Sequence, residues 1–352
     1  MSQICTSQAS HTTVLVVPTG IGATIGGYAG DALPVARAIA TVTDTLITHP
    51  NVLNGAQLYW PIPNAYYVEG YGLDQFAAGR WGLQPVHQNR VGLLLDAAIE
   101  EDLRWRHLQA ADAARATLGL DLTDYVVTDA PLGVTLRTAG SGATWGTIEN
   151  PDSLLRGVER LVEDGASAIA IIARFPDDED SEVLTAYRHG QGVDPLAGAE
   201  AVISHLVVKT FQIPCAHAPA LQPLPLDPSV SPRAAAEELG YTFLPCVLAG
   251  LSRAPRFVGP TQGLHAQQVN AAIFPASAFG GSAALSLSQT GTTLIAVADN
   301  QTQTQVSAAS LGVKAIHVSS YLEAIGILAC QRAGISERAL APKIDRLRQI
   351  SV

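Results

Sequence analysis

Charged residues are scarce in this chain. They make up 15% of its 352 residues, while hydrophobic residues make up 47%. Because soluble proteins usually carry about 25% charged residues, much of this chain is expected to be buried. A chain of this length buries about three quarters of its surface on folding, which excludes intrinsic disorder and collagen-like structure. The length predicts about two domains or one large α/β unit.

Cysteine and long apolar runs are also scarce. The four cysteines contain no CxxC pair, which excludes a disulfide framework and fits a reducing cytosol. The first residues, MSQICTSQASHTT, lack the basic and apolar segments of a signal peptide. The longest apolar run, residues 166–173, is far shorter than the roughly 20 residues that span a bilayer. These features predict a cytoplasmic protein without a membrane partner.

Positive charge is the minority charge. The formal net charge is −10, from 21 Lys and Arg against 31 Asp and Glu. A nucleic-acid surface needs clustered positive charge, and the sequence has no such cluster. We therefore expect no nucleic-acid partner. The low charge and the abundant alanine and glycine predict burial in a homo-oligomer, most simply a dimer.

The pattern of apolar runs predicts an α/β fold. Runs typical of buried strands lie at residues 12–18, 44–48, 91–95 and 125–128, and helices are expected at 31–42, 100–118 and 152–163. A glycine followed by an apolar strand recurs at residues 165–173, 291–299 and 312–320, which is typical of the joint between a helix and a strand in βαβ units. The prediction is two packed lobes with mostly parallel, Rossmann-like sheets.

Other segments set the expected boundaries. Residues 49–90 are rich in Pro, Gly and aromatic residues, which predicts a long functional loop, and residues 140–150 are rich in turn formers. A proline-rich stretch at 214–232 places the expected lobe boundary between residues 213 and 214, giving lobes 1–213 and 214–352. The segment 340–348 is amphipathic and predicts a final docking helix.

The first candidate motif is the glycine-rich loop PTGIGATIGGYAGD between a predicted strand and helix. Gly20 and Gly22 begin a dinucleotide fingerprint, but Gly26 comes one residue late, and no Walker lysine follows. Backbone amides in such a loop can bind an anion. The alternative is that these glycines only permit tight turns.

The second motif is HPNVLNG, at the end of the second predicted strand. Ligands bind outside the carboxyl ends of strands in open α/β sheets. We therefore expect His49 to act as a general acid or base, with Asn51 and Asn54 orienting a polar substrate. The alternative is that the asparagines and the proline only build turns.

The third motif is NAYYVEGYG. Glu69 lies among aromatic residues, and an apolar site would raise the pKa of its carboxyl and make it a usable acid or base. Asn64 and Tyr67 are candidate substrate-binding residues beside it. The alternative is an exposed glutamate on an aromatic loop.

The fourth motif is PCAHAP. His217 is a candidate catalytic residue. Cys215 and His217 are two residues apart and Cys246 could join them as a zinc site, but no second closely spaced ligand pair occurs, so no metal is assigned. A cysteine nucleophile with a histidine base and a buried, inert cysteine are further readings.

The fifth motif is SAFGGSAAL, which opens a helix made of small residues. Gly280, Gly281 and Ser282 offer free amides and a helix dipole to a phosphate or carboxylate, and Asn300 ends the strand that follows. The alternative is close packing of helix and strand. Asp96 and Asp129 follow two other strands and either build the same face or cap helices.

Two resemblances rest on these motifs. GGYAGDALP, HPNVLNG, FLPCVLAG and SAFGGSAAL resemble a family of cyanobacteria and plastids known as domain of unknown function 3326. The resemblance covers nearly the whole chain and implies a stand-alone protein of photosynthetic lineages, but it supplies no catalytic residues.

The layout of the two glycine-rich segments is also similar to two-lobed glycosyltransferases that use nucleotide sugars. In that family the first loop faces the acceptor and the second helix start grips the diphosphate. This sequence departs from the pattern, with Tyr28, Ala29 and Asp31 where a histidine is usual. Ser286 or Ser288 stands where a ribose-binding glutamate is expected. The similarity is one of layout only.

Together the motifs predict an enzyme that acts on a small polar or anionic metabolite between the lobes. Its acid or base would be His49, Glu69 or His217, and the residues assign no cofactor. Two alternatives stay open: a non-catalytic protein that binds a metabolite, and a nucleotide-sugar glycosyltransferase.

Overall fold

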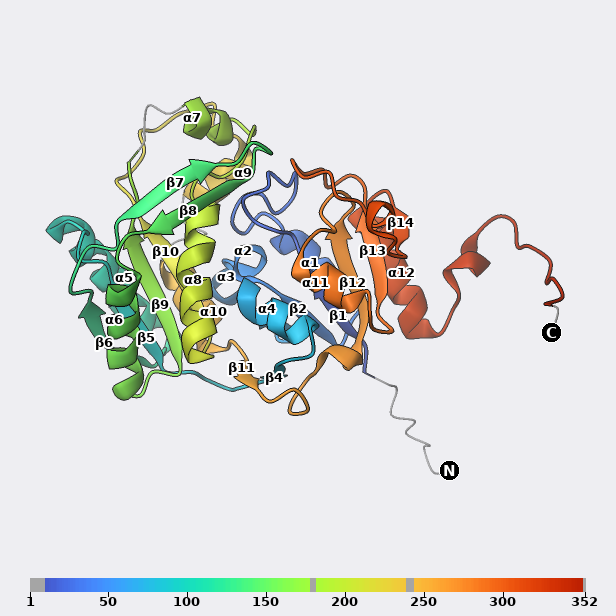
Figure 1. The fold of residues 1–352 in the computed structure, drawn as a ribbon, viewed down its shortest axis with the longest axis horizontal. Helices are drawn as coiled ribbons and strands as arrows, with labels where there is room; N and C mark the ends of the chain where they lie inside the picture. Colours follow the sequence, from blue (N-terminus) through green and yellow to red (C-terminus); the bar gives the residue numbers. More distant parts are fainter. Residues whose placement is uncertain (1–9, 178–181, 239–243, 351–352) are drawn as a thin grey trace.

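Buried apolar runs form two large parallel sheets, each the centre of one lobe (Figure 1). The structure is a computed structural model and describes residues 10–177, 182–238 and 244–350. The six-stranded sheet has the order β14-β13-β12-β1-β2-β3, and the four-stranded sheet has the order β10-β9-β5-β6. All neighbours in both sheets are parallel. The predicted two-lobed α/β class is confirmed.

The strands of the six-stranded sheet come from both ends of the chain. They are β1 (Thr12–Leu15), β2 (Thr45–Thr48), β3 (Ala65–Tyr67), β12 (Val269–Pro275), β13 (Thr293–Val297) and β14 (Ile316–Val318). The central strand β1 pairs with β2 on one side and with β12 on the other.

The four-stranded sheet comes from the middle of the chain. Its strands are β5 (Val91–Leu95), β6 (Leu122–Val127), β9 (Ala168–Arg174) and β10 (Cys215–Ala220). Every residue of β5 is buried, as expected for a strand covered on both faces. The boundary predicted at 213/214 falls just before β10, which pairs with β9, so the sheets do not follow that division.

Two antiparallel ribbons accompany the sheets. One pairs β7 (Val134–Thr138) with β8 (Thr144–Ile148), and β8 lies in the segment 140–150 where the sequence predicted turns. The other pairs β4 (Gly82–Gln84) with β11 (Arg256–Val258). This second ribbon lies beside the two places where the chain passes between the sheets.

Helices cover the sheets and fill the space between the lobes. The helices are α1 (Leu33–Ala40), α2 (Pro50–Leu53), α3 (Ala56–Tyr59), α4 (Gly70–Ala77), α5 (Glu101–Leu118), α6 (Pro151–Glu163), α7 (Glu182–Arg188), α8 (Ala197–Phe211), α9 (Pro232–Ala236), α10 (Leu244–Ser252), α11 (Ser282–Leu287) and α12 (Tyr321–Ala333). Helices α4 and α8 pack together between the sheets (Figure 1). Short 3₁₀ turns occur at Ala266–Gln268, Ala309–Leu311 and Glu337–Leu340.

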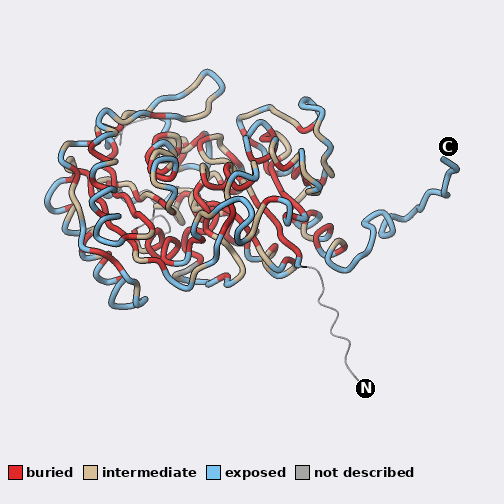
Figure 2. Tube along the Cα trace, turned by 60° about the horizontal axis from the view of Figure 1, so that its bottom comes forward, coloured by how far each residue is buried: buried red, intermediate tan, exposed pale blue. Residues whose placement is uncertain are grey.

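Two sequence predictions about segments are wrong. Residues 49–90 are not a single loop, because they hold α2, α3, β3, α4 and β4. Residues 341–350 have no helix and lie exposed away from the lobes (Figure 2). An isolated amphipathic segment has no surface on which to bury its apolar face, and helices gain most of their stability from such packing.

In the described part of the chain, no helix combines the length and the apolar character needed to cross a bilayer.

Candidate functional site

Glu69 and His205 form a carboxyl–imidazole pair between the lobes. Glu69 is the N-cap of α4, and its Oε2 accepts hydrogen bonds from the amides of Tyr71 and Gly72. Its Oε1 lies 3.1 Å from Nε2 of His205, which comes from α8. Gly70 allows this approach, because a Cβ there would lie 2.9 Å from Nε2 of His205.

Burial controls the protonation of this pair. The Glu69 side chain is 4% exposed, and desolvation raises the pKa of its carboxyl to about 8 despite the two amide donors. Desolvation, with His217 nearby, lowers the pKa of His205 to about 4. Near neutral pH the proton of the pair therefore resides on Glu69, and His205 is a neutral acceptor.

A second pair of the same kind lies next to the first. Nε2 of His217, on β10, is 3.6 Å from Oε2 of Glu200, on α8. Because His217 lowers the pKa of His205, the two imidazoles lie within electrostatic reach of each other. The hydroxyl of Ser204 on α8 also bonds to the Glu69 carboxyl. Helix α8 thus supplies three polar side chains to one place.

Four buried polar side-chain atoms have no hydrogen-bond partner among the described residues. They are the Tyr67 hydroxyl, Nδ1 of His217, Oδ1 of Asn54 and Nε of Arg104. Tyr67 is 3% exposed, and desolvation, with Cys246 and Cys215 nearby, raises the pKa of its hydroxyl. Buried polar groups are rarely left unpaired in native proteins, so these atoms are candidates for contact with a ligand.

The cysteines of this region are inert apolar side chains. Burial raises the pKa of the Cys215 thiol well above its usual value and that of the Cys246 thiol to about 12. A protonated thiol is a weak nucleophile, so the structure offers no support for a cysteine nucleophile. Nor does the described chain hold a group of three His, Cys, Asp or Glu side chains suited to a metal ion.

His49 bonds to the backbone that follows β1. Its Nε2 accepts the amide hydrogen of Val17 at 3.1 Å. Desolvation by burial lowers the pKa of His49 to about 4, so the ring is neutral near pH 7. In this state it serves as an acceptor for the backbone at the end of β1.

The glycine-rich loop joins the two lobes. The carbonyl of Gly20 accepts from the amide of Thr144 at 2.9 Å, and a Cβ on Gly22 would lie 3.0 Å from the carbonyl oxygen of Gly192. Both glycines have positive φ, at 70° and 61°. Their observed role is thus to form turns that pack against the other lobe.

The amides of this loop that were expected to bind an anion are occupied by the chain itself. The amide of Gly26 donates to Asp31 at 2.6 Å, and that of Ala29 donates to Glu237 at 2.9 Å. Immediately before Gly26, the amide of Ile25 donates to Oδ1 of Asn300. Internal carboxylates and amides therefore stand where an external anion was predicted.

Three of the predicted substrate-binding asparagines, Asn51, Asn64 and Asn300, have internal partners. Asn51 donates to the Gly26 carbonyl at 2.8 Å. Asn64 lies at the amino end of β3 and donates to the Ala40 and Thr43 carbonyls. Asn300 is fully buried, and its Nδ2 bonds to the Ile25 carbonyl and to the Tyr321 hydroxyl.

The start of α11 also has an internal anion. Gly280 and Gly281 precede this helix, and Ser282 is its first residue. The carboxylate of Asp74 on α4 bonds to the Ser282 side chain and the Ala283 amide. The diphosphate position implied by the glycosyltransferase layout is therefore occupied by Asp74.

A cluster of carboxyl groups and tyrosines packs against the glycine-rich loop. The ring of Tyr28 stacks on that of Tyr187 with centroids 4.4 Å apart, and the Tyr187 hydroxyl donates to Glu237 at 2.7 Å. Desolvation raises the pKa of Glu237 to about 7, and it raises that of Asp194 well above its usual value.

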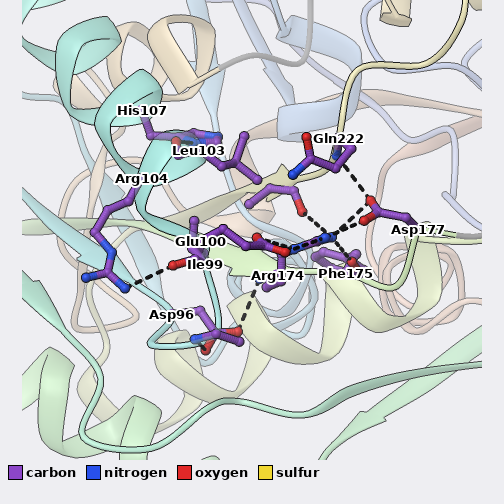
Figure 3. Close-up of polar contacts among 12 residues, drawn as sticks. Asp96, Ile99, Glu100, Leu103, Arg104, His107, Arg174, Phe175, Asp177 and Gln222 are labelled. Carbon is purple, nitrogen blue, oxygen red and sulfur yellow. Dashed lines mark hydrogen bonds and ion pairs between the residues drawn. The ribbon is translucent and has the colours of Figure 1, made fainter.

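The carboxyl edge of the four-stranded sheet is held by ion pairs and backbone bonds (Figure 3). Arg174, at the end of β9, binds Glu100 at 2.8 Å and also Asp177. Asp96 accepts from the amides of Leu132 and Arg174 and from Ala98. Asp129 pairs with Arg156 at 2.7 Å. Both predicted aspartates are thus engaged in structural contacts.

The sequence reasoning missed His205 and Glu200. A detectable signal was present, because α8 reads AGAEAVISHLVVKTF and is apolar almost all round. A helix of this kind is buried, and each polar side chain on it needs a partner.

Three comparisons place the chain among known proteins. The sequence profile of a family described as a protein of unknown function (DUF3326) matches residues 12–341. An uncharacterized lipoprotein of Synechococcus sp. is 62% identical over 346 residues, covering 97% of this chain and 96% of that protein. No solved structure matches the chain.

The predicted cytoplasmic location is wrong, because this highly similar relative is named a lipoprotein. The prediction rested on cysteine spacing and composition, and these do not indicate whether a protein carries a lipid anchor.

Proposed function

The chain belongs to the DUF3326 family, whose description names no activity, and we propose that it is an enzyme for proton transfer on a small polar or anionic metabolite. The reaction takes place between the lobes, at Glu69, His205, His217 and Glu200. The Glu69–His205 pair carries the proposal, because a carboxyl buried to 4% exposure lies 3.1 Å from an imidazole.

The pair has the properties of a general acid. A carboxyl with a pKa of about 8 holds its proton at neutral pH and still releases it readily. His205 is 41% exposed at its side chain, so it links the buried carboxyl to the solvent side of the site. A proton given to a substrate by Glu69 can be replaced through this imidazole.

Buried groups without hydrogen-bond partners would bind the substrate. The Tyr67 hydroxyl and Oδ1 of Asn54 are buried without partners, so a ligand that hydrogen-bonds to them removes a cost of about 1–3 kcal/mol per group. Nδ1 of His217 is equally unpartnered, and its other nitrogen faces Glu200. These groups favour a substrate that carries several hydroxyl or carboxylate oxygens.

The test compares Glu69→Gln with the unaltered protein. Each is incubated with a small-molecule extract, and mass spectrometry follows the compounds that are consumed and formed. Glutamine can still accept the Tyr71 and Gly72 amides and so preserve the helix cap, but it has no proton to transfer. We expect turnover with the unaltered protein and a loss of at least about 100-fold with Glu69→Gln.

Asp129→Asn is the matched control, since it removes a carboxylate at the surface of the other lobe. Equal turnover by the Glu69 variant would overturn the assignment. Binding of a metabolite without turnover by any form would instead identify a non-catalytic binding protein.

We also propose that the chain forms a dimer through the outer edge of the four-stranded sheet. Trp105 on α5 and Tyr125 on the edge strand β6 are large and exposed. Light scattering on Trp105→Ser should show a monomer where the unaltered protein is a dimer, and a monomer in both would refute this assembly.

A further inference from the structure

A pocket of about 390 Å³ lies where the chain crosses between the two sheets. Its lining includes Ile62, Tyr66, Pro85, Val86, His87 and Arg253. Residues 85–90 lead from the β4 ribbon into β5, and residues 253–255 lead from α10 back to β11. The pocket therefore lies on both crossings and on the edge strand β3.

Asn89 fixes the two crossings to each other. It is fully buried, and its Nδ2 donates to the carbonyls of Leu251 and Ala254 at 2.9 and 2.8 Å. Its amide donates to the Ser252 carbonyl at 2.7 Å. These bonds bracket Arg253 on both sides and hold it beside His87, two residues before Asn89.

The opposite wall is equally well fixed. Asn64 bonds to the Ala40 and Thr43 carbonyls, and the Ala65 amide donates to the Ile62 carbonyl at 3.0 Å. Ile62 is buried, whereas Tyr66 contributes a half-buried ring. A pocket with both walls held in this way needs little rearrangement to bind a ligand, which favours affinity.

The chemistry of the lining favours an anion with an apolar body. Apolar and aromatic side chains form the walls, Arg253 and His87 supply N–H donors, and none of the described residues that line the pocket is an Asp or Glu. This is unusual in a chain with a net charge of −10. Arg253 forms no ion pair among the described residues, so its guanidinium is available to a ligand.

The size of the pocket is also suitable. Ligand sites usually have volumes of about 300–1,000 Å³, and 390 Å³ lies in that range. A second pocket, beside Asp31 and Trp60, measures about 190 Å³ and is smaller than such sites.

We propose that this crossing pocket binds a small organic carboxylate with a flat or branched apolar body. Its carboxylate pairs with Arg253, His87 donates a further hydrogen bond, and its apolar part lies against Ile62 and Tyr66. This site is separate from the Glu69–His205 pair and does not depend on the proposed enzymatic function.

The test uses 4-fluorobenzoate as the probe and ¹⁹F NMR titration of the full chain as the readout. Saturable binding is expected, with affinity at least about tenfold weaker in Arg253→Gln, because a charge-assisted pair is lost. Neutral 4-fluorobenzamide should bind about tenfold more weakly than the acid. Arg106→Gln, which changes an exposed arginine on α5, should bind the acid normally.

A second variant tests, independently of charge, whether the probe binds in this pocket. Val86→Trp fills the pocket and keeps Arg253, so it should abolish binding while leaving thermal unfolding unchanged within a few degrees. Absence of binding by the unaltered chain, equal affinity for acid and amide, or undiminished binding by either pocket variant would overturn the proposal.

Discussion

The buried carboxyl of Glu69 makes a specific prediction about stability and pH. Its pKa is about 8 in the folded chain, against an ordinary value of 4.5. Between these two values the folded state holds a proton that the unfolded state has lost. The contribution of Glu69 to the free energy of unfolding is therefore at its maximum below about pH 4.5, and it is lost as the pH rises from there through about 8.

Substitution of Glu69 by Gln removes this pH dependence. One pKa unit corresponds to about 1.36 kcal/mol, and the carboxyl is mostly protonated in the folded state over most of the interval from about pH 6 to about pH 8. From about pH 6 to about pH 8, the free energy of unfolding of the unaltered protein should therefore fall by about 2 kcal/mol relative to that of Glu69→Gln. Other buried acids, such as Glu237 with a pKa of about 7, act equally in both proteins and cancel in the difference.

Urea unfolding of both proteins at about pH 6, 7 and 8, followed by tryptophan fluorescence, measures this difference. Glu163→Gln, on the exposed face of α6, controls for the loss of one negative charge. A difference between Glu69→Gln and the unaltered protein that stays constant from about pH 6 to about pH 8 would show that Glu69 is ionised in the folded state. The reasoning about the general acid would then fail with it.

Three further predictions concern packing and caps. Asn300→Ala leaves buried backbone groups and a hydroxyl unpaired and should lower the free energy of unfolding by about 2–4 kcal/mol in urea. Asp74→Ala removes the anion at the start of α11 and should cost about 1 kcal/mol, seen as a lower Tm. Gly72→Ala should cost about 1–3 kcal/mol because its Cβ would overlap the Phe257 ring, whereas Gly281→Ala, with open space around it, should change stability little. An equal effect of the two glycine substitutions would contradict the packing described for Gly72.

The sequence predicted the local elements well where burial is complete. Residues 91–95 form β5 with the predicted ends because every side chain is buried between turns. It gave no information about which strands are neighbours. The pairing of β1 with β12 is set by contacts between residues far apart in the chain, and no local pattern encodes such a pairing.

One member of each carboxyl–imidazole pair stands in a motif that the sequence singles out. Glu69 and His217 stand in conspicuous motifs next to strands, but His205 and Glu200 lie on a helix whose pattern only indicates burial. The glycine-rich segments were predicted to bind an external anion, and this expectation failed for a related reason. Their amides do bind acidic groups, but these are the carboxyl groups of Asp31, Glu237 and Asp74 of the same chain. A motif alone does not reveal which carboxyl group will reach it.

The origin of the six-stranded sheet from both ends of the chain determines the order in which the protein can be built. During synthesis β1, β2 and β3 leave the ribosome first, yet the partner of β1, β12, begins only at Val269. The four-stranded sheet is complete once Ala220 has emerged, so it can assemble while β1 still has an unpaired edge. Unpaired strand edges invite aggregation, so chains that end before β12 should depend on chaperones far more than the finished protein does.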